Sequence, residues 1–395
     1  MPAAALAADH GTPLVVYCER TIRARARAYR DAVPGALVVF GTKAFPNVAV
    51  LRLLAQEGVG ADVSTLGELG FALRAGLLGE QLVFHGNNKS DEELRAAAEA
   101  GALVVLDALE EVARAREAGV RRVLVRLRPA VEAATHPAIR TAHRESKFGL
   151  EAGEALAAIR EALAQGLDVA GVHVHVGSQL TRVEESELAV DRLAELCRAS
   201  RDELGWTPRL VDLGGGLGVA QTSDDEVPDA AEFARSLAER FRADWPEPAQ
   251  IVLEPGRSLV GQAGVTLYRV GAVKPRAGFL DVAVDGGMSD NPRPQLYGAL
   301  YTALLATPAA GRPEVECRIV GKHCESGDVL IERCRLPEPR RGDLLAVPAT
   351  GAYTLAMGSN YNVVPRPAAV LVADGEARVI RSRETIEHLL AREDG

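Results

Sequence analysis

A short apolar run followed by a helical pattern occurs eight times between residues 36 and 257. The runs end at Lys43, Asp62, His85 to Asn87, Asp107, Arg128, His175, Gly214 and Glu254 to Arg257. Strands that are covered by helices on both faces form continuous Val, Ile and Leu runs without polar alternation. Eight such units predict an α/β fold, a (β/α)8 TIM barrel whose active site gathers at the C-terminal ends of the strands.

Amphipathic segments with apolar residues three and four positions apart separate these runs, and each predicts a helix. They cover residues 47–56, 66–74, 91–100, 110–117, 153–164, 184–201 and 232–241. Ser90 with Glu93 resembles a capping box, which marks a helix start. Residues 129–148 are too long and irregular for an ordinary βα loop, so we expect a functional loop there.

The sequence after Arg257 changes to short β-rich stretches divided by Pro and Gly clusters. They cover residues 259–273, 280–284, 315–320, 329–334, 343–347 and 368–379. A further strand is predicted at residues 13–17 and is expected to pair with them. The predicted organisation is a barrel of residues 19–263 and a mostly β domain of residues 1–18 and 264–395.

Composition narrows the functional class. A chain of 395 residues with 47% hydrophobic and 25% charged residues is typical of a soluble enzyme with a large core. The net charge of -9 argues against nucleic acid and anionic membranes as partners. We find no signal peptide and no membrane span, so we expect a cytoplasmic protein. The five cysteines include no CxxC pair, and neither a disulfide framework nor a metal site is expected.

Lys43 is the first candidate site residue. It follows a run that should be buried, so its amine is expected at the barrel mouth among apolar walls, where desolvation favours a neutral nucleophile. The alternative is a lysine that leaves the strand end for solvent. The Gly214 to Gly216 turn can bring backbone N–H groups close to a phosphate, or it can be only a tight turn.

Residues after the sixth and eighth runs complete the pattern. Glu254 can hold a pyridinium nitrogen and Arg257 an anion, although the two can also form a structural ion pair. Either His173 or His175 can lie flat on a ligand ring, or both can be hydrogen-bonded barrel histidines. An amine nucleophile, a phosphate cradle, a ring-stacking histidine and a carboxylate together indicate pyridoxal 5'-phosphate (PLP).

Longer motifs make a family resemblance specific. The chain carries GTKAFPN, GADVSTLGEL, HGNNKS, SKFGL, HVHVGSQL, DLGGGLG, EPGRSLV, DGGMSDNPRPQLYGA, HCESGDVL and TGAYTLAMGSNYN, in this order and over nearly its whole length. In this it resembles the fold-type III PLP-dependent decarboxylases, and among them the diaminopimelate decarboxylases.

The resemblance implies roles for individual residues. Lys43 would carry PLP covalently, His175 would stack on its ring and Glu254 would bind the ring nitrogen. Cys324 would donate a proton from the partner subunit, unless it is a small buried filler residue. The full cofactor-binding set would be Lys43, Asp62, His175, Ser178, Gly214, Gly215, Gly216, Glu254, Pro255, Gly256, Arg257 and Tyr353. The substrate would be bound by Arg257, Arg293, Tyr297, Glu325 and Tyr353.

The implied activity is decarboxylation of meso-2,6-diaminopimelate to L-lysine and CO2, the last step of lysine biosynthesis. The enzyme would be a homodimer with shared active sites, in which the β domain contributes to the substrate site and the interface. Glu325 after Cys324 favours diaminopimelate over ornithine. Decarboxylation of ornithine, arginine, carboxynorspermidine or a carrier-attached amino acid stays open, as does a non-catalytic PLP-binding role.

Overall fold

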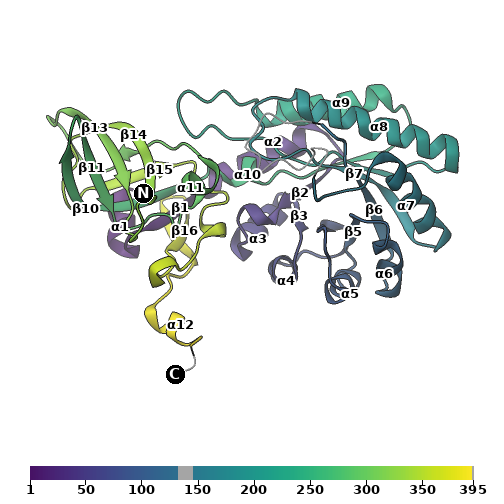
Figure 1. Cartoon of the computed structure of the whole chain (residues 1–395), viewed down its shortest axis with the longest axis horizontal. Helices are drawn as coiled ribbons and strands as arrows, with labels where there is room; N and C mark the ends of the chain where they lie inside the picture. The colour runs from purple at the N-terminus through teal and green to yellow at the C-terminus, as the bar shows by residue number, and fades with distance from the viewer. Residues whose placement is uncertain (132–145, 394–395) are drawn as a thin grey trace. The chain divides into compact units, whose positions relative to one another are not determined.

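The computed structural model describes residues 1–131 and 146–393 (Figure 1). The chain divides into two compact units. One, the barrel unit, comprises Arg23–Gly218 and Glu226–Leu259. The other, the β-rich unit, comprises Met1–Ile22, Val219–Asp225 and the chain from Val260 onward.

Eight parallel strands close the barrel in chain order. They are β2 (Leu37–Gly41), β3 (Gly60–Val63), β4 (Leu82–Phe84), β5 (Leu103–Leu106), β6 (Arg122–Leu127), β7 (Asp168–Val174), β8 (Leu210–Asp212) and β9 (Gln250–Leu253). The barrel closes where Leu37 of β2 pairs with Val252 of β9. The predicted TIM barrel is therefore confirmed.

Helices surround the strands on the outside of the barrel (Figure 1). They are α2 (Glu19–Ala32), α3 (Val48–Gln56), α4 (Leu66–Ala75), α5 (Asp91–Glu99), α6 (Glu111–Glu117), α7 (Ala152–Ala164), α8 (Glu184–Leu204) and α9 (Ala230–Asp244). The seven predicted helices correspond to α3 through α9. The capping box at the start of α5 is confirmed, since the Ser90 side chain accepts from the Glu93 N–H and Glu93 accepts from the Ser90 N–H.

A buried apolar layer fills part of the barrel and takes side chains from seven of its eight strands. Its members are Val39, Val83, Leu103, Val105, Leu124, Ala170, Leu210 and Val252. The remaining strand, β3, begins at Gly60, where a Cβ would lie 2.2 Å from the Gln81 carbonyl oxygen. Because apolar side chains occupy this layer, polar groups inside the barrel lie at the C-terminal ends of the strands.

The β-rich unit is built around β10 (Gly264–Arg276). The sheet order is β14-β13-β11-β10-β1-β16-β17, and β15 pairs with both β10 and β12. The other strands are β1 (Leu14–Cys18), β11 (Phe279–Val284), β12 (Leu304–Leu305), β13 (Glu314–Val320), β14 (Val329–Pro337), β15 (Leu344–Pro348), β16 (Ala368–Ala373) and β17 (Glu376–Arg381). The N-terminal strand β1 pairs with β10 and β16, as predicted.

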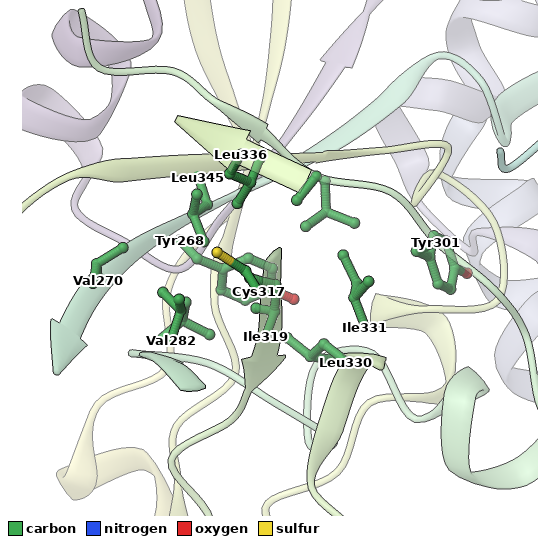
Figure 2. Packing of buried hydrophobic residues seen from close by; sticks show 13 residues of the cluster. Tyr268, Val270, Val282, Tyr301, Cys317, Ile319, Leu330, Ile331, Leu336 and Leu345 are labelled. Atoms are coloured by element: carbon green, nitrogen blue, oxygen red, sulfur yellow. The ribbon is translucent and has the colours of Figure 1, made fainter. Parts of the chain in front are cut away.

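One core of this unit gathers around the fully buried Tyr268 (Figure 2). Val282 from β11, Ile319 from β13 and Leu345 from β15 belong to the same cluster. Because the members come from strands far apart in sequence, the sheet and its core form together.

Two of the predicted β-rich stretches differ from the structure in detail. The stretch 259–273 begins in the short helix α10 (Arg257–Val260), and the strand starts only at Gly264. An apolar run this short does not distinguish a helix from a strand. The stretch 368–379 is a hairpin of β16 and β17, turned by Asp374 and Gly375 with φ of 51° and 85°. An Asp-Gly pair favours such a turn because both residues tolerate positive φ.

The short helices α1 (Ala3–His10), α11 (Arg293–Tyr297) and α12 (Ile386–Leu390) were not predicted. In the predicted functional loop 129–148, residues 132–145 lie outside the described part of the chain. Among the described residues, no helix is long and apolar enough to cross a membrane.

Gly171 gives a test of barrel packing. A Cβ added to Gly171 of β7 would lie 1.8 Å from the Leu210 carbonyl oxygen of the neighbouring β8. We expect Gly171→Ala to lower the free energy of unfolding by about 1–3 kcal/mol or more, measured by urea denaturation. The control is Gly70→Ala in α4, where a Cβ meets nothing within 4 Å. The control should not destabilise the protein, and an equally stable Gly171→Ala variant would contradict the packing described here.

Candidate active site

Lys43 lies in a 3-10 turn, Thr42–Ala44, directly after β2. Its Nζ is 3.3 Å from Asp62 Oδ2 at the end of β3. In place of the predicted apolar walls, the lysine side chain is 51% exposed and stands beside a carboxylate that is 4% exposed. The amine is thus held by a buried anion while it stays open to a reactant.

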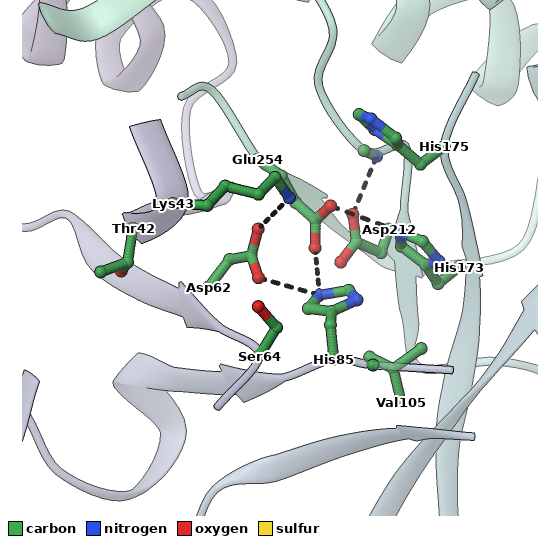
Figure 3. A network of polar contacts seen from close by, with 12 residues as sticks. Thr42, Lys43, Asp62, Ser64, His85, Val105, His173, His175, Asp212 and Glu254 are labelled. Atoms are coloured by element: carbon green, nitrogen blue, oxygen red, sulfur yellow. Dashed lines mark hydrogen bonds and ion pairs between the residues drawn. The ribbon is translucent and has the colours of Figure 1, made fainter. Parts of the chain in front are cut away.

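Glu254 follows β9 and is a buried charge of the site. His85 Nε2 lies 2.6 Å from Glu254 Oε1, and His173 Nε2 lies 3.3 Å from Oε2 (Figure 3). Burial alone would raise the pKa of Glu254, but His85 and His173 outweigh burial and hold this pKa well below its ordinary value. Glu254 is therefore a carboxylate inside the barrel.

His173 is the neutral member of this group. Burial lowers the pKa of His173 to about 4, although the Glu254 carboxylate favours the protonated ring. The ring therefore donates from Nε2 to Glu254 as a neutral imidazole, a tautomer that we infer from the hydrogen bond.

Asp212, at the end of β8, is a second buried carboxyl group beside Glu254. Its Oδ1 accepts the Gly214 N–H at 2.9 Å. Burial, followed by the charge of Glu254, raises the pKa of Asp212 well above its ordinary value. The negative charge of this pair accordingly resides on Glu254.

His175 follows β7 and accepts the Gly215 N–H at Nδ1, at 3.3 Å. Burial, and then the charge of Lys43, lowers the pKa of His175 well below its ordinary value. The ring is neutral, which suits stacking on an aromatic ligand.

The Gly214 to Gly216 turn packs against its neighbours too closely for side chains. A Cβ on Gly214 would lie 2.4 Å from the Val174 carbonyl oxygen, and one on Gly215 would lie 2.1 Å from that of Glu254. Gly214 and Gly216 also have φ of 68° and 110°. Tight packing therefore explains these glycines by itself, and their phosphate-binding role stays a prediction.

Arg257 and Ser178 are in direct contact, which fits the prediction that both bind the same anionic group. Arg257 is buried, and its Nη2 donates to Ser178 Oγ at 3.0 Å. The preceding Pro255 accepts the Gly41 N–H at 3.2 Å, and Gly256 is in close contact with Gly41. The 254–257 segment is in this way anchored to the end of β2.

The predicted substrate residues other than Arg257 belong to the β-rich unit. Arg293 lies between Pro292 and Pro294 but is only 2% exposed, so it is not a solvent-exposed turn arginine. Its Nε donates to Tyr301 Oη at 3.0 Å, and its guanidinium lies 5.6 Å from the Tyr297 ring centroid. Tyr353 has a positive φ of 57°.

Cys324 and Glu325 share one exposed turn. Cys324 is exposed, so it is not the buried filler residue of the alternative interpretation. Its N–H donates to Asn362 Oδ1 at 2.9 Å, and Tyr361 Oη is 3.5 Å from Glu325 Oε2. The turn is also fixed by the buried pair His323 and Asp328, 2.7 Å apart.

His85 and Asp212 also lie at strand ends, although no role was predicted for them from the sequence. Their position was visible in the sequence, but their pairing depends on barrel closure. His85, His173, Asp212 and Glu254 offer ligand atoms within 4.8 Å of one another, a geometry that can hold a metal ion. Because both histidines already lie against Glu254, we interpret the group as a polar network that surrounds this carboxylate.

Comparison with known proteins identifies the family. Residues 19–261 match the family model described as "Pyridoxal-dependent decarboxylase, pyridoxal binding domain". The chain belongs to the pyridoxal-dependent decarboxylase family. It is 45% identical to a diaminopimelate decarboxylase of Actinosynnema pretiosum, over 100% of this chain and 91% of that protein. It is 43% identical to that of Bacillus subtilis, over 98% and 92%.

Solved structures of this family agree. Diaminopimelate decarboxylase from Helicobacter pylori, complexed with L-lysine, has a TM-score of 0.92 and 32% identity, covering 98% of each chain. Diaminopimelate decarboxylase from m. jannaschii, also in complex with L-lysine, has a TM-score of 0.93 and 33% identity, covering 100% of this chain and 94% of that one. The predicted family and its class of cofactor are confirmed.

The residues of the barrel unit fit PLP. A half-exposed amine at Lys43 provides an attachment point, and the ionised Glu254 provides a partner for a protonated ring nitrogen. The neutral His175 and the buried Arg257 supply a stacking ring and a cation. Nothing in this set requires a metal.

The low pKa of His173 gives a prediction for stability. In the unfolded chain His173 has its ordinary pKa of about 6.5, whereas in the folded protein its pKa is about 4. Between these two pH values the unfolded chain therefore binds a proton at His173 that the folded protein does not bind. As the pH is lowered from about 6.5 to about 4, the free energy of unfolding should therefore fall, by up to about 3 kcal/mol from this group. In His173→Gln this component should be absent, as followed by urea denaturation at successive pH values.

The exposed His388 offers a control. His388→Gln should leave the wild-type pH dependence intact. Parallel curves for the wild type and His173→Gln would contradict the neutral, buried state of His173.

Proposed function

We propose that this protein decarboxylates meso-2,6-diaminopimelate to L-lysine and CO2, with PLP as its cofactor, as the last step of lysine biosynthesis. One observation carries the proposal: a single buried group of strand-end residues presents the Lys43 amine at one side and the ionised Glu254 at the other. The diaminopimelate decarboxylases at 43–45% identity support the choice of substrate.

When bound, PLP supplies a protonated pyridinium ring that accepts the electron pair left by the departing carboxyl group. Lys43 would hold the cofactor through its Nζ. Glu254 keeps the ring nitrogen protonated, and its carboxylate is preserved by hydrogen bonding with His173. Asp62 Oδ2, 3.3 Å from Lys43 Nζ, would stabilise this amine in its charged form.

His175, Ser178, Arg257 and the glycine turn hold the remainder of the cofactor. We assign the phosphate to the Gly214 to Gly216 turn with Ser178, because the buried Arg257 is hydrogen-bonded to Ser178 and adds positive charge there. His175 orients the ring, and Asp62, Pro255, Gly256 and Tyr353 complete the proposed cofactor set.

The substrate is assigned to residues of the β-rich unit together with Arg257. A substrate whose far end is itself an amino acid needs a cation for its distal carboxylate and an anion for its distal ammonium. Arg293 provides the first and Glu325 the second, with Tyr297 and Tyr353 beside them in the proposed set. Cys324 is proposed to return a proton to the carbon that lost CO2.

Two further features of the enzyme are part of the proposal. The protein acts as a homodimer in which Cys324 and Glu325 of one subunit serve the barrel of the other, so the β-rich residues 1–18 and 264–395 contribute to the interface. It works in the cytoplasm. The exposed position of Cys324 on its turn supports the first feature.

The substrate is tested directly by CO2 release. Purified protein with PLP is mixed in separate reactions with meso-diaminopimelate, ornithine, arginine and L-lysine. We expect release from diaminopimelate at least about 100-fold faster than from the others, because Arg293 and Glu325 would otherwise be left unpaired. Faster release from ornithine would select the alternative decarboxylase, and no release from any amino acid would support a binding protein.

Shared sites are tested by mixing two inactive variants, Lys43→Ala and Cys324→Ala. A mixed dimer has one site with both residues intact, so random exchange should restore up to about one quarter of wild-type activity. Subunit exchange is confirmed by mass spectrometry of differently labelled chains. Full exchange without recovered activity would rule out sites shared between subunits.

A further inference from the structure

A continuous chain of polar contacts runs through the barrel from the amine to the buried carboxylate (Figure 3). Lys43 Nζ is 3.3 Å from Asp62 Oδ2, and Asp62 Oδ1 is 3.7 Å from His85 Nε2. The same His85 nitrogen is 2.6 Å from Glu254 Oε1. Within this chain of contacts, His85 thus links the two carboxylates.

The main chain of His85 is fixed from both sides. Its N–H donates to the Val63 carbonyl at 2.7 Å, one residue beyond Asp62. The carbonyl of the next residue, Gly86, accepts from Lys89 Nζ at 2.6 Å. The His85 ring also meets His173 edge-on, with ring centroids 4.9 Å apart. Neither the backbone nor the ring can turn away without breaking these contacts.

Lys89 explains how this segment is anchored. Its side chain is fully buried, and besides Gly86 its Nζ contacts the Val105 carbonyl at 2.8 Å and Glu111 Oε1 at 3.0 Å. A buried charge is costly unless it is paired and hydrogen-bonded, so this lysine holds the 85–89 segment firmly to β5 and α6. The sequence motif HGNNKS therefore contains both His85 and the lysine, Lys89, that holds its segment in place.

We propose that His85 is a positioning residue that couples the two ends of the cofactor site, holding Glu254 toward the ring nitrogen while it stabilises Asp62 beside Lys43. This inference rests on the proposed function. His85 Nε2 lies within 4 Å of both carboxylates, so a change of charge at Lys43 and Asp62 alters the surroundings of Glu254 through this ring. We therefore expect the pH midpoint of the bound cofactor to depend on His85.

The charged and titratable groups around His85 come from several strands. Asp62 from β3, His173 from β7 and Glu254 after β9 contact it directly. Lys43 and Asp212 lie one contact farther out, next to Asp62 and Glu254 respectively. Asp107 after β5 and Arg126 of β6 are a separate buried pair, 3.4 Å apart.

The test uses two substitutions and reads cofactor binding as well as activity. His85→Phe keeps a ring but removes the donor, whereas His85→Gln keeps a donor near the position of Nε2. PLP affinity is measured by titrating apoprotein, and the pH midpoint is read from the absorbance of the bound cofactor. We expect His85→Phe to weaken PLP binding about 10- to 100-fold, the worth of one hydrogen bond to a charged group, and to shift the midpoint.

His85→Gln should recover most of the affinity but keep a shifted midpoint, because an amide carries no ring that can lie against both Glu254 and Asp62. Ser200→Ala is the control: it removes a buried hydrogen bond to the Leu196 carbonyl in α8, away from the network. It should change thermal stability without changing the midpoint. Apoprotein melting curves separate a folding defect from a positioning effect.

A wild-type midpoint and affinity in His85→Phe would overturn the inference. If His85→Phe does not fold, an unshifted midpoint in His85→Gln would overturn it equally. The proposed function fails in a different way, namely if the wild type itself binds no PLP or releases no CO2 from diaminopimelate. If the wild type binds PLP and the His85 variants show the wild-type affinity and midpoint, the proposed role of His85 is contradicted while the proposed function is not.

Discussion

The ionised Glu254 inside the barrel is the constraint on which the other assignments depend. A buried carboxylate without partners would take up a proton, and it could not then keep a ring nitrogen protonated. Here His85 and His173 contact its two oxygens, while the neighbouring Asp212 retains its proton more readily than an ordinary carboxyl group. The barrel thereby concentrates one negative charge at one position.

The architecture makes this charge possible because polar residues that are distant in sequence lie at or just after the C-terminal ends of barrel strands. Asp62, His85, His173 and Glu254 come from β3, β4, β7 and β9, and a closed barrel brings these ends into one ring. The apolar layer that includes Val39 and Val252 fills the barrel interior next to these polar ends. The β-rich unit carries a different chemistry, with a buried guanidinium at Arg293 and an exposed thiol at Cys324.

Much of this arrangement could be predicted from sequence because it depends on local patterns. The eight apolar runs predicted the barrel, and family motifs predicted the roles of Lys43 and Glu254. The His85 and Glu254 pair was not predictable in this way, since it joins residues 169 positions apart through barrel closure. The Asp374–Gly375 hairpin was different: its local signal was present and was overlooked.

The charge state of the ring nitrogen tests the central claim most directly. PLP labelled with nitrogen-15 at the ring would be bound to the wild type and to Glu254→Gln, and its chemical shift recorded by NMR. Our account predicts a protonated ring nitrogen in the wild type and an unprotonated one in Glu254→Gln. An unprotonated nitrogen in the wild type, or the same shift in both proteins, would contradict it.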